Sequence, residues 1–541
     1  MPQIKGDSRL QLMMLNLEEQ IHHNSSVRLI DSFIQGADLE ELGFIVKGKS
    51  HEGRPAYKPE ILTKLYLYGY LNGIRSSRKL QKECERNIEL WWLLSLQKPR
   101  YKTIADFRKN NALGFGNLFI YFRDFCIDLD LYGRKHVAID GSKFRAQNSK
   151  KRNYNARKIK QHLEYIDEQQ QRYFEDLDRN DKKDNDDDDT LDHLQRRRQK
   201  YNKLKEQLDN TDETQISATD PDARAMPIHM NIVEVAYNLQ STVDDKHNLI
   251  VDYQVTNKKD DRALAPMALR AKKALKISSG ETLTVLADKG YHTAQQLDEC
   301  HNNGINTIVA IPKKPKQTDR TKPEFLRKDS FSYNPLLDLY TCPNGEQLSK
   351  QARYKRKSKG KVWGYFDRYA IKYSICKTCP YINQCVSESN RNSHSGRYID
   401  RYLNDHAVEL NKVNVNNNRA LYKKRQAIVE HPFDECMNPQ DRCLGDIEMY
   451  EPQGGWVSKR QWGYTYTLLK TIPKVQTEFS IIALCYNLRR SMSILTHKGL
   501  KMALKRTYLN VLSISLPLKH LRGTFFNLHP HTSQRFSLSY L

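Results

Sequence analysis

Two aspartates in this chain each close a short apolar run and are followed by a glycine. Asp140 ends the run His-Val-Ala-Ile-Asp before Gly141, and Asp288 ends the run Val-Leu-Ala-Asp before Lys289 and Gly290. Such runs predict buried β-strands, so each carboxylate is expected at the C-terminal tip of a strand. The glycines let the chain turn tightly or let a ligand come close. A single aspartate in this position is commonly a turn or helix-cap residue, but two matching tips predict an oxygen-rich pocket that suits Mg²⁺.

The elements expected around these aspartates alternate between strands and helices. Strands rich in branched residues are predicted at 135–139, 232–239, 249–255, 283–287 and 306–311. Apolar residues at helical spacing predict a helix over 261–275. Thr293 and Gln296 predict a capping box at the start of another helix, which Gly304 is placed to end. This order predicts an α/β fold in which helices pack on a mixed sheet.

Residues 1–130 are expected to form an N-terminal helical domain. Apolar spacing predicts one helix from Pro59 to Gly73 and a second over 79–94. Thr103 and Asp106 form the pattern of a capping box and predict the start of a third helix. Three short helices suit binding of a helix in a DNA groove, and they suit a plain helical domain almost as well.

Two further segments differ in composition from the rest of the chain. Between Arg152 and Asn210, two apolar helical faces flank the acidic run 184–189, which predicts a helical-hairpin insertion over 151–215. Lys and Arg exceed Asp and Glu by 24 over the whole chain, and no acidic residue follows Glu478. We expect a basic C-terminal tail over 496–541, either a phosphate-contacting surface or a solvated extension.

Four of the ten cysteines are grouped between the two halves of the predicted core. These are Cys342 before a Pro-Asn-Gly turn, the pair Cys376 and Cys379, and Cys385. Their residue types and spacing match the ligand set of a structural Zn²⁺ site, and reduced, partly buried cysteines are the alternative. Aromatic and basic residues interleave nearby, as expected of a β-ribbon that touches DNA. The segment 321–400 is therefore predicted to be a zinc-ribbon-like β insertion.

Several motifs occur in the same order as in a known family. The sequence resembles bacterial insertion-sequence transposases of the DDE class, which have a ribonuclease-H-like core. The resemblance runs from Gly53 to Asn487. It is carried by Gly-Arg-Pro-Ala-Tyr at 53–57, Ser-Ser-Arg at 76–78, Thr-Ile-Ala-Asp-Phe-Arg at 103–108, Ala-Ile-Asp-Gly-Ser at 138–142, Ala-Asp-Lys-Gly-Tyr at 287–291, Tyr-Lys-Lys-Arg at 422–425 and Val-Glu-His-Pro-Phe at 429–433.

The resemblance implies a metal-dependent enzyme that cuts and rejoins DNA. It implies that Asp140 and Asp288, on strands, are metal ligands and that Glu430, on a helix, is the third carboxylate ligand. Two Mg²⁺ or Mn²⁺ ions would flank the scissile phosphate. The catalytic core would then comprise 131–320 and 401–495. Residues expected to contact DNA are Tyr422, Arg425, Lys143, Lys289, Arg54, Arg78 and Arg108.

The sequence departs from the family just after the third carboxylate. Asp434 and Met437 stand where relatives usually have Gly and Lys, so a DNA-binding regulator without turnover stays an alternative, as does a metal-dependent nuclease that does not join strands. Pro432 biases His431 away from helix, which places Glu430 at a helix end. Glu435 is the substitute candidate for the third carboxylate.

The expected partner is double-stranded DNA, as terminal inverted repeats and as target. A transposase acts on two DNA ends together, so a homodimer or larger assembly is expected. The start of the chain lacks an apolar signal segment, and no stretch is long and apolar enough to span a bilayer, so the protein is expected in the cytoplasm.

Overall fold

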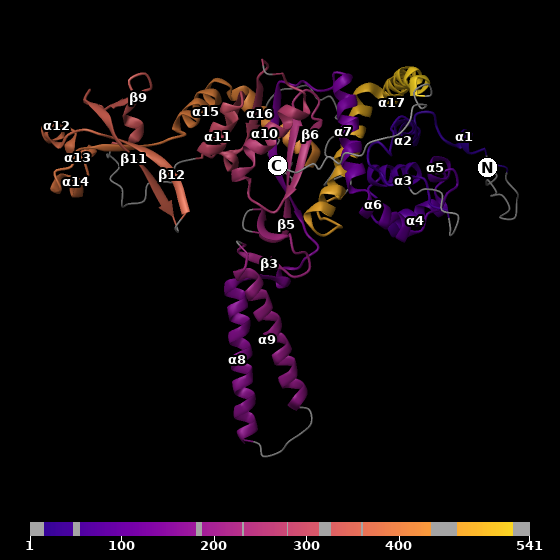
Figure 1. The fold of residues 1–541 in the computed structure, drawn as a ribbon, viewed down its shortest axis with the longest axis horizontal. Coiled ribbons are helices and arrows are strands. Elements are labelled where there is room, and N and C mark those ends of the chain that lie inside the picture. Colours follow the sequence, from indigo (N-terminus) through magenta and orange to yellow (C-terminus); the bar gives the residue numbers. More distant parts are fainter. Residues whose placement is uncertain are drawn as a thin grey trace, which may run out of the picture.

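The computed structural model describes Met14 and residues 16–46, 55–179, 187–211, 213–229, 232–278, 280–312, 326–358, 361–433 and 463–522. Figure 1 shows a central α/β body with helices of the N-terminal part on one side and a separate β-sheet on the other. A long helical hairpin projects from the central body. Among the described helices, none combines the length and the apolar character that a bilayer span needs.

The central body is built on a six-stranded mixed sheet. Its strands are β1 (His136–Arg145), β4 (Arg224–His229), β5 (Ile232–Asp244), β6 (Ile250–Thr256), β7 (Leu283–Ala287) and β8 (Ile305–Val309). The order is β4-β5-β1-β7-β8, and β6 also pairs with β5. β1 is antiparallel to β5 and parallel to β7, and β7 is parallel to β8. This arrangement confirms the mixed sheet expected of a ribonuclease-H-like core.

Helices from distant parts of the sequence cover this sheet. They are α10 (Leu264–Ala274), α11 (Ala294–Asn302), α15 (Asp405–Asn417), α16 (Arg419–Phe433) and α17 (Ile472–Arg522). α10 contacts β1, β5, β6 and β7; α16 contacts β1, β5 and β7; α11 and α15 lie against β8. Val137, Ala138 and Ile139 of β1 are fully buried, as expected for a central strand covered on both faces.

The N-terminal helices share one core with the sheet. They are α1 (Leu17–Gln20), α2 (Ser26–Gln35), α3 (Pro59–Leu71), α4 (Ser77–Arg86), α5 (Ile88–Leu93), α6 (Tyr101–Asn110) and α7 (Ala112–Asp128). α17 contacts α2, α3 and α7 as well as β6, so it lies between the two parts. Buried residues from Ile21 to Leu504 form a single hydrophobic cluster. The N-terminal helices are therefore held against the core by apolar burial.

Three details of the helix predictions were wrong. The helix expected over 79–94 is two helices, because Asn87 has extended backbone angles and its side chain caps α5. Thr103 lies inside α6, whose N-cap is Arg100. Thr293 is the N-cap of α11, but its hydroxyl donates to the carbonyl of Asp261 and makes no cap hydrogen bond. Of the three, the role of Thr293 depends on a tertiary contact, which a local pattern does not report.

The projecting hairpin consists of α8 (Ala156–Arg179) and α9 (Asp187–Asp209), joined to the core beside the short strands β2 (Asn153–Asn155) and β3 (Gln215–Ser217) (Figure 1). Its own small core includes Ile159, Ile166 and Tyr201, which confirms the predicted apolar faces. Phe174 was expected on that face, but it is 53% exposed.

The second sheet is an insertion between β8 and α15. Its order is β13-β12-β11-β10-β9. The strands are β9 (Ser332–Asn334), β10 (Leu339–Thr341), β11 (Gln347–Ser358), β12 (Lys361–Ala370) and β13 (Tyr398–Tyr402), and the short helices α12 (Tyr373–Lys377), α13 (Ile382–Cys385) and α14 (Glu388–Asn392) lie between β12 and β13. Its buried residues form a hydrophobic cluster of their own.

A buried ion pair ties the N-terminal helices to α17. The carboxylate of Glu478 is fully buried and accepts a hydrogen bond from Arg75 Nη1 at 2.9 Å. The same carboxylate accepts the backbone N–H groups of Leu468 and Leu469, and the Arg75 guanidinium lies over the Tyr464 ring. Because both charges are removed from water, each depends on the other.

Replacing Glu478 with alanine should therefore destabilise the protein strongly. The substitution leaves the Arg75 charge buried without its partner, which costs about 3–5 kcal/mol of unfolding free energy. Urea unfolding of Glu478→Ala measures this loss. Glu206→Ala, at an exposed position on α9, is the control and should change the unfolding free energy by less than about 0.5 kcal/mol. Equal stability of the two variants would contradict this role of the ion pair.

Candidate active site

The strand register brings the two predicted aspartates together. In the parallel pair of β1 and β7, His136 lies beside Thr284 and Ile139 lies beside Ala287. Asp140 and Asp288 are the next residue on each chain, so they lie side by side where β7 ends. β1 itself continues to Arg145 as a partner of β5. Asp140 is therefore not at a strand tip, as predicted, but at the point where β1 loses its parallel neighbour.

The charge of the Asp140 carboxylate is poorly compensated. Burial raises the pKa of Asp140, and the neighbouring Asp288 raises it further; Arg425 and the N–H of Gly141 act in the opposite direction, and the net shift is upward. The guanidinium of Arg425 is the cation paired with this carboxylate, and its Nη1 lies 4.0 Å from Asp140 Oδ2. Asp288 Oδ1 accepts the N–H of Gly290 at 2.7 Å. A pair of adjacent carboxylates with so little compensation favours an added cation.

The third predicted carboxylate comes from α16, which packs across β1, β5 and β7. Ile428 and Val429 are buried in the main core, and the partly buried Glu430 accepts a hydrogen bond from Gln426 at 2.7 Å. Arg425 from the same helix faces Asp140. One helix thus carries both Glu430 and the arginine beside the first aspartate.

The predicted helix end before Pro432 was wrong, because α16 continues through His431 to Phe433. His431 Nδ1 lies 2.7 Å from the Tyr486 hydroxyl, and this contact with α17 holds the last turn against the preference of a residue before proline. Asp434, Glu435 and Met437 lie outside the described residues.

The carboxylates offer a donor set made only of oxygen, which is the chemistry that Mg²⁺ and Mn²⁺ prefer. In the part of the chain that the structure describes, no three His, Cys, Asp or Glu side chains are arranged so that they could hold a metal ion as they stand. Side-chain rotation would therefore have to accompany metal binding at Asp140, Asp288 and Glu430. The residue types and the uncompensated charge at Asp140 fit a divalent cation.

The residues predicted to contact DNA are in different environments. Lys289 and Arg78 are exposed, and the Arg78 guanidinium lies over the Tyr101 ring. Tyr422 is partly buried against the main core. Arg54 lies outside the described residues.

Two of these predicted contacts have internal roles. Arg108 is only 7% exposed and donates to the Tyr70 hydroxyl, so its predicted contact with DNA is corrected: it is a core residue. Lys143 donates to Gly141 O and to both carboxylate oxygens of Asp260. These three acceptors match the three N–H donors of an ammonium group.

Asp260 and its partners Asn238 and Gln240 were missed in the sequence, and Lys143 was predicted only as a DNA contact. Asp260 accepts hydrogen bonds from Lys143, Asn238 and Gln240 beside the active-site strands. It sits in the charged stretch Lys-Lys-Asp-Asp-Arg, which looks like a solvated loop. The available signal was its position soon after a predicted strand, as for Asp140 and Asp288.

The four predicted cysteine ligands line one small cavity in the insertion. The cavity, about 30 Å³, is bordered by Cys342, Cys376, Cys379 and Cys385. The backbone N–H of Glu346 donates to Cys342 Sγ at 3.3 Å. Burial raises the pKa of Cys385 to about 11, so without a metal this thiol is protonated at neutral pH. All four cysteines are free of disulfides.

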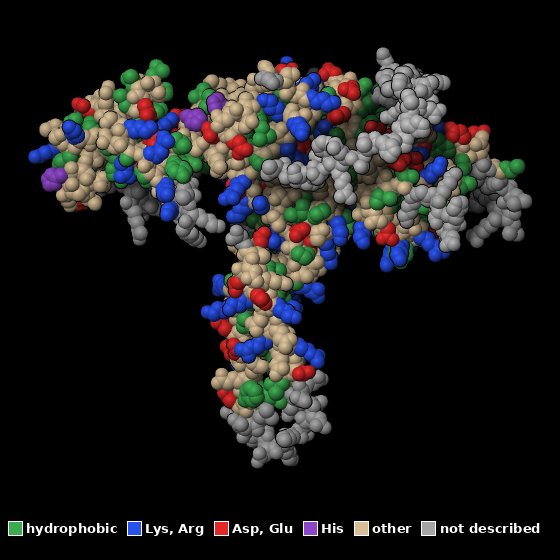
Figure 2. All heavy atoms as spheres, viewed as in Figure 1, with side chains coloured by type: hydrophobic (Ala, Val, Ile, Leu, Met, Phe, Trp, Pro, Cys, Tyr) green, Lys and Arg blue, Asp and Glu red, His purple; other side chains and the backbone are tan. Residues whose placement is uncertain are grey.

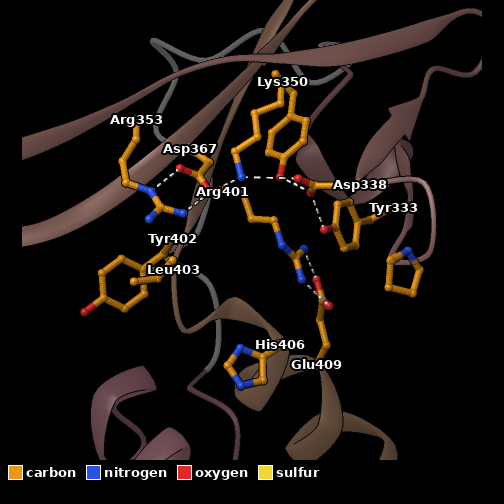
Figure 3. A pocket seen from close by; sticks show the side chains of 12 residues that line it. Tyr333, Asp338, Lys350, Arg353, Asp367, Arg401, Tyr402, Leu403, His406 and Glu409 are labelled. Atoms are coloured by element: carbon orange, nitrogen blue, oxygen red, sulfur yellow. Dashed lines mark hydrogen bonds and ion pairs between the residues drawn. The ribbon is translucent and has the colours of Figure 1, made fainter.

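A wider cavity of about 540 Å³ lies where the insertion sheet meets α15 (Figure 3). Its charged side chains point at one another: Arg353 pairs with Asp367, and Arg401 pairs with Glu409. Hydrogen bonds from Arg353 and Lys350 lower the pKa of Asp367 to about 2, against the effect of burial. The charged side chains that line this cavity therefore compensate one another. None of the three predicted carboxylates lines it.

Comparison with known proteins shows the family of this chain. Residues 15–110 match a family model described as a transposase domain (DUF772), and residues 211–442 match the transposase DDE domain. Asp288 and Glu430 lie within the second match, and Asp140 lies between the two. No curated protein matches the chain.

A solved structure, the piggyBac transposase synaptic complex with hairpin DNA, aligns with 94% of this chain and 87% of that chain. The sequence identity is 10% and the TM-score is 0.28, values too low to add to the assignment. The two family models, which match separate parts of the chain in order, are sufficient. This chain is a DDE transposase, a polynucleotidyl transferase that binds DNA and depends on divalent metal ions.

Proposed function

We propose that this transposase binds the terminal inverted repeats of an insertion sequence, cuts the DNA strands at its ends and joins the freed 3′ ends to target DNA. The observation that carries the proposal is the pairing of Asp140 and Asp288 on adjacent parallel strands. Glu430 on the helix packed across those strands supports it.

Asp140, Asp288 and Glu430 are the residues that would hold Mg²⁺ or Mn²⁺, as two ions. Bound there, the metal would lower the pKa of the attacking hydroxyl and stabilise the leaving oxygen. Among the chain's own groups, Arg425 lies close enough to Asp140 to orient that carboxylate, and its buried Nη1 has no hydrogen-bond partner among the described residues. We infer that this nitrogen is available to a phosphate oxygen of the scissile strand.

The DNA path is proposed from the exposed basic residues near the sheet. Figure 2 shows Lys and Arg side chains gathered where the helical hairpin leaves the central body. Exposed basic residues of this region are Lys150, Lys151, Arg152, Arg157, Lys203 and Lys205. The first four follow β1, the strand that carries Asp140, and Lys203 and Lys205 lie near the end of α9. This surface, together with Lys289, would contact the phosphates of a duplex held at the carboxylates. Two such chains would be needed to hold two ends, so we propose a homodimer or larger assembly.

Replacing Asp140 with asparagine tests the mechanism. The variant keeps the side-chain shape but removes the charge that a metal needs, so cleavage of a DNA fragment carrying the element end should fall on the order of 10⁴-fold. Gel-shift binding of the same fragment in EDTA should not change. Asp209→Asn, exposed on α9, is the control with normal cleavage.

The possible results separate the alternatives. Normal cleavage by Asp140→Asn would remove this carboxylate from the mechanism. A wild-type protein that binds the fragment without cutting it would be a regulator, and one that cuts without joining would be a nuclease.

We also propose that Cys342, Cys376, Cys379 and Cys385 bind one structural Zn²⁺. All four border one cavity, although as they stand no three of them are arranged to hold an ion, so side-chain rotation would accompany binding. The backbone N–H directed at Cys342 Sγ would stabilise a thiolate. Burial of a zinc site next to the insertion's small core would contribute directly to folding of this sheet.

The zinc proposal predicts one zinc per purified chain, measured by inductively coupled plasma mass spectrometry. Cys379→Ser should lose most of this zinc because one of four ligands is gone. Cys300→Ala, which removes a buried thiol of α11 far from the cluster in sequence, should keep it. Absence of zinc from the wild-type chain, or equal zinc in both variants, would reject the site.

A further inference from the structure

A carboxylate outside the predicted triad lies at the centre of a hydrogen-bond network beside the active site. Asp260 begins the short 3₁₀ helix Asp260–Arg262 that precedes α10. Its Oδ1 accepts from Asn238 Nδ2 at 2.8 Å and from Gln240 Nε2 at 2.7 Å, and its Oδ2 accepts from Lys143 Nζ at 2.9 Å. Asn238 and Gln240 are buried on β5, and Lys143 is on β1. Asp260 therefore links the two strands on which the active site is built.

Asp260 also fits against the residues that follow each active-site aspartate. A Cβ on Gly141 would lie 2.4 Å from Asp260 Oδ1, so the absence of a side chain there makes room for the carboxylate. A Cβ on Gly290 would lie 3.8 Å from the Cβ of Asp260. The Asp260 side chain thus lies against β1 directly after Asp140 and near the 3₁₀ turn that follows Asp288.

A buried tyrosine connects the network to both aspartates. The Tyr291 hydroxyl donates to Gln240 Oε1 at 2.5 Å, and the ring is fully buried. Burial raises the pKa of Tyr291, and the charges of Asp260, Asp140 and Asp288 raise it further. All three carboxylates therefore lie near one hydroxyl, which keeps its proton and can only donate to Gln240.

Lys143 is the cation that Asp260 restrains. Its side chain is 17% exposed, and both Asp260 oxygens hold its ammonium group. Lys143 is also close enough to Asp140 to affect that carboxylate electrostatically. Without Asp260, the ammonium charge would lose the carboxylate that balances it on its own face of β1, so its repulsion of a divalent cation at Asp140 would increase.

We propose that Asp260 is a positioning residue that holds Lys143 and packs against Gly141 of β1, so that Asp140 and Asp288 stay open to the divalent metal. Asp260 is not itself proposed as a ligand, because its oxygens already accept hydrogen bonds from Lys143, Asn238 and Gln240. This inference rests on the proposed metal-dependent function and adds a residue that the triad does not contain.

The test compares Mn²⁺ binding by calorimetry with cleavage of the DNA end. Asp260→Asn should weaken Mn²⁺ binding about 10–100-fold and slow cleavage by a similar factor, as expected for a partner that orients metal ligands. DNA binding in EDTA should not change. Asp261→Asn, the exposed neighbouring carboxylate, is the matched control and should bind Mn²⁺ like the wild type.

A second substitution distinguishes positioning from simple loss of structure. In the double variant Asp260→Asn with Lys143→Met, the unbalanced cation is gone, so Mn²⁺ affinity should recover at least threefold relative to Asp260→Asn. Gly141→Ala gives a second route, because its methyl group would clash with Asp260 and with Gln240 and Asn238, the two amides that hold Asp260. It should weaken Mn²⁺ binding as Asp260→Asn does. Gly116→Ala, where a Cβ would meet nothing within 4 Å, is its control. Thermal unfolding shows whether each variant folds. If Asp260→Asn does not fold, the Mn²⁺ affinity of Gly141→Ala decides the test.

Wild-type Mn²⁺ affinity in Asp260→Asn or Gly141→Ala would overturn the inference. Equal weakening in Asp261→Asn, or no recovery in the double variant, would overturn it as well. These results differ from failure of the proposed function, in which Asp140→Asn would keep both Mn²⁺ binding and cleavage.

Discussion

The fold holds two like charges next to each other at the point where β7 stops and β1 continues. Parallel pairing in register makes Asp140 and Asp288 neighbours, and burial together with the adjacent carboxylate raises the pKa of Asp140. The elements around the two aspartates determine how far these charges are compensated. α16 brings Arg425 to one side, and the network of Asp260 occupies Lys143 on the other. The result is a pair of carboxylates that protein cations compensate only in part, which is the electrostatic condition for binding a divalent ion.

Rigid support for this pair comes from the shared core. The sheet, α16, α17 and the N-terminal helices bury their apolar side chains in one cluster, and the Arg75–Glu478 pair links the N-terminal helices to α17 inside it. The helical hairpin and the insertion sheet have separate small cores. A division of this kind packs the active-site strands into the shared core and leaves the hairpin and the insertion sheet outside it.

Much of the core could be predicted because its signals are local. The branched run 283–287 coincides with β7, and the hairpin and mixed sheet follow from apolar periodicity. The two aspartates were identified from their own strands. Features that depend on distant contacts could not be read in this way. Arg108 belongs to a family-like motif, but its burial against Tyr70 arises from helix packing. Asp260 gains its importance from Gly141 and from two amides on β5, which no local pattern connects. The helical state of His431 depends on Tyr486, 55 residues later.

The central claim is that Asp140 and Asp288 jointly bind the metal that acts on DNA. A crystal structure of the chain bound to an uncut element end in Mn²⁺, with data collected at the manganese absorption edge, tests it most directly. The account predicts anomalous density between these two carboxylates, in contact with Glu430 and a backbone phosphate. Manganese bound to the DNA elsewhere, with Asp140 and Asp288 contacting only protein groups in crystals that cut the DNA when warmed, would contradict it.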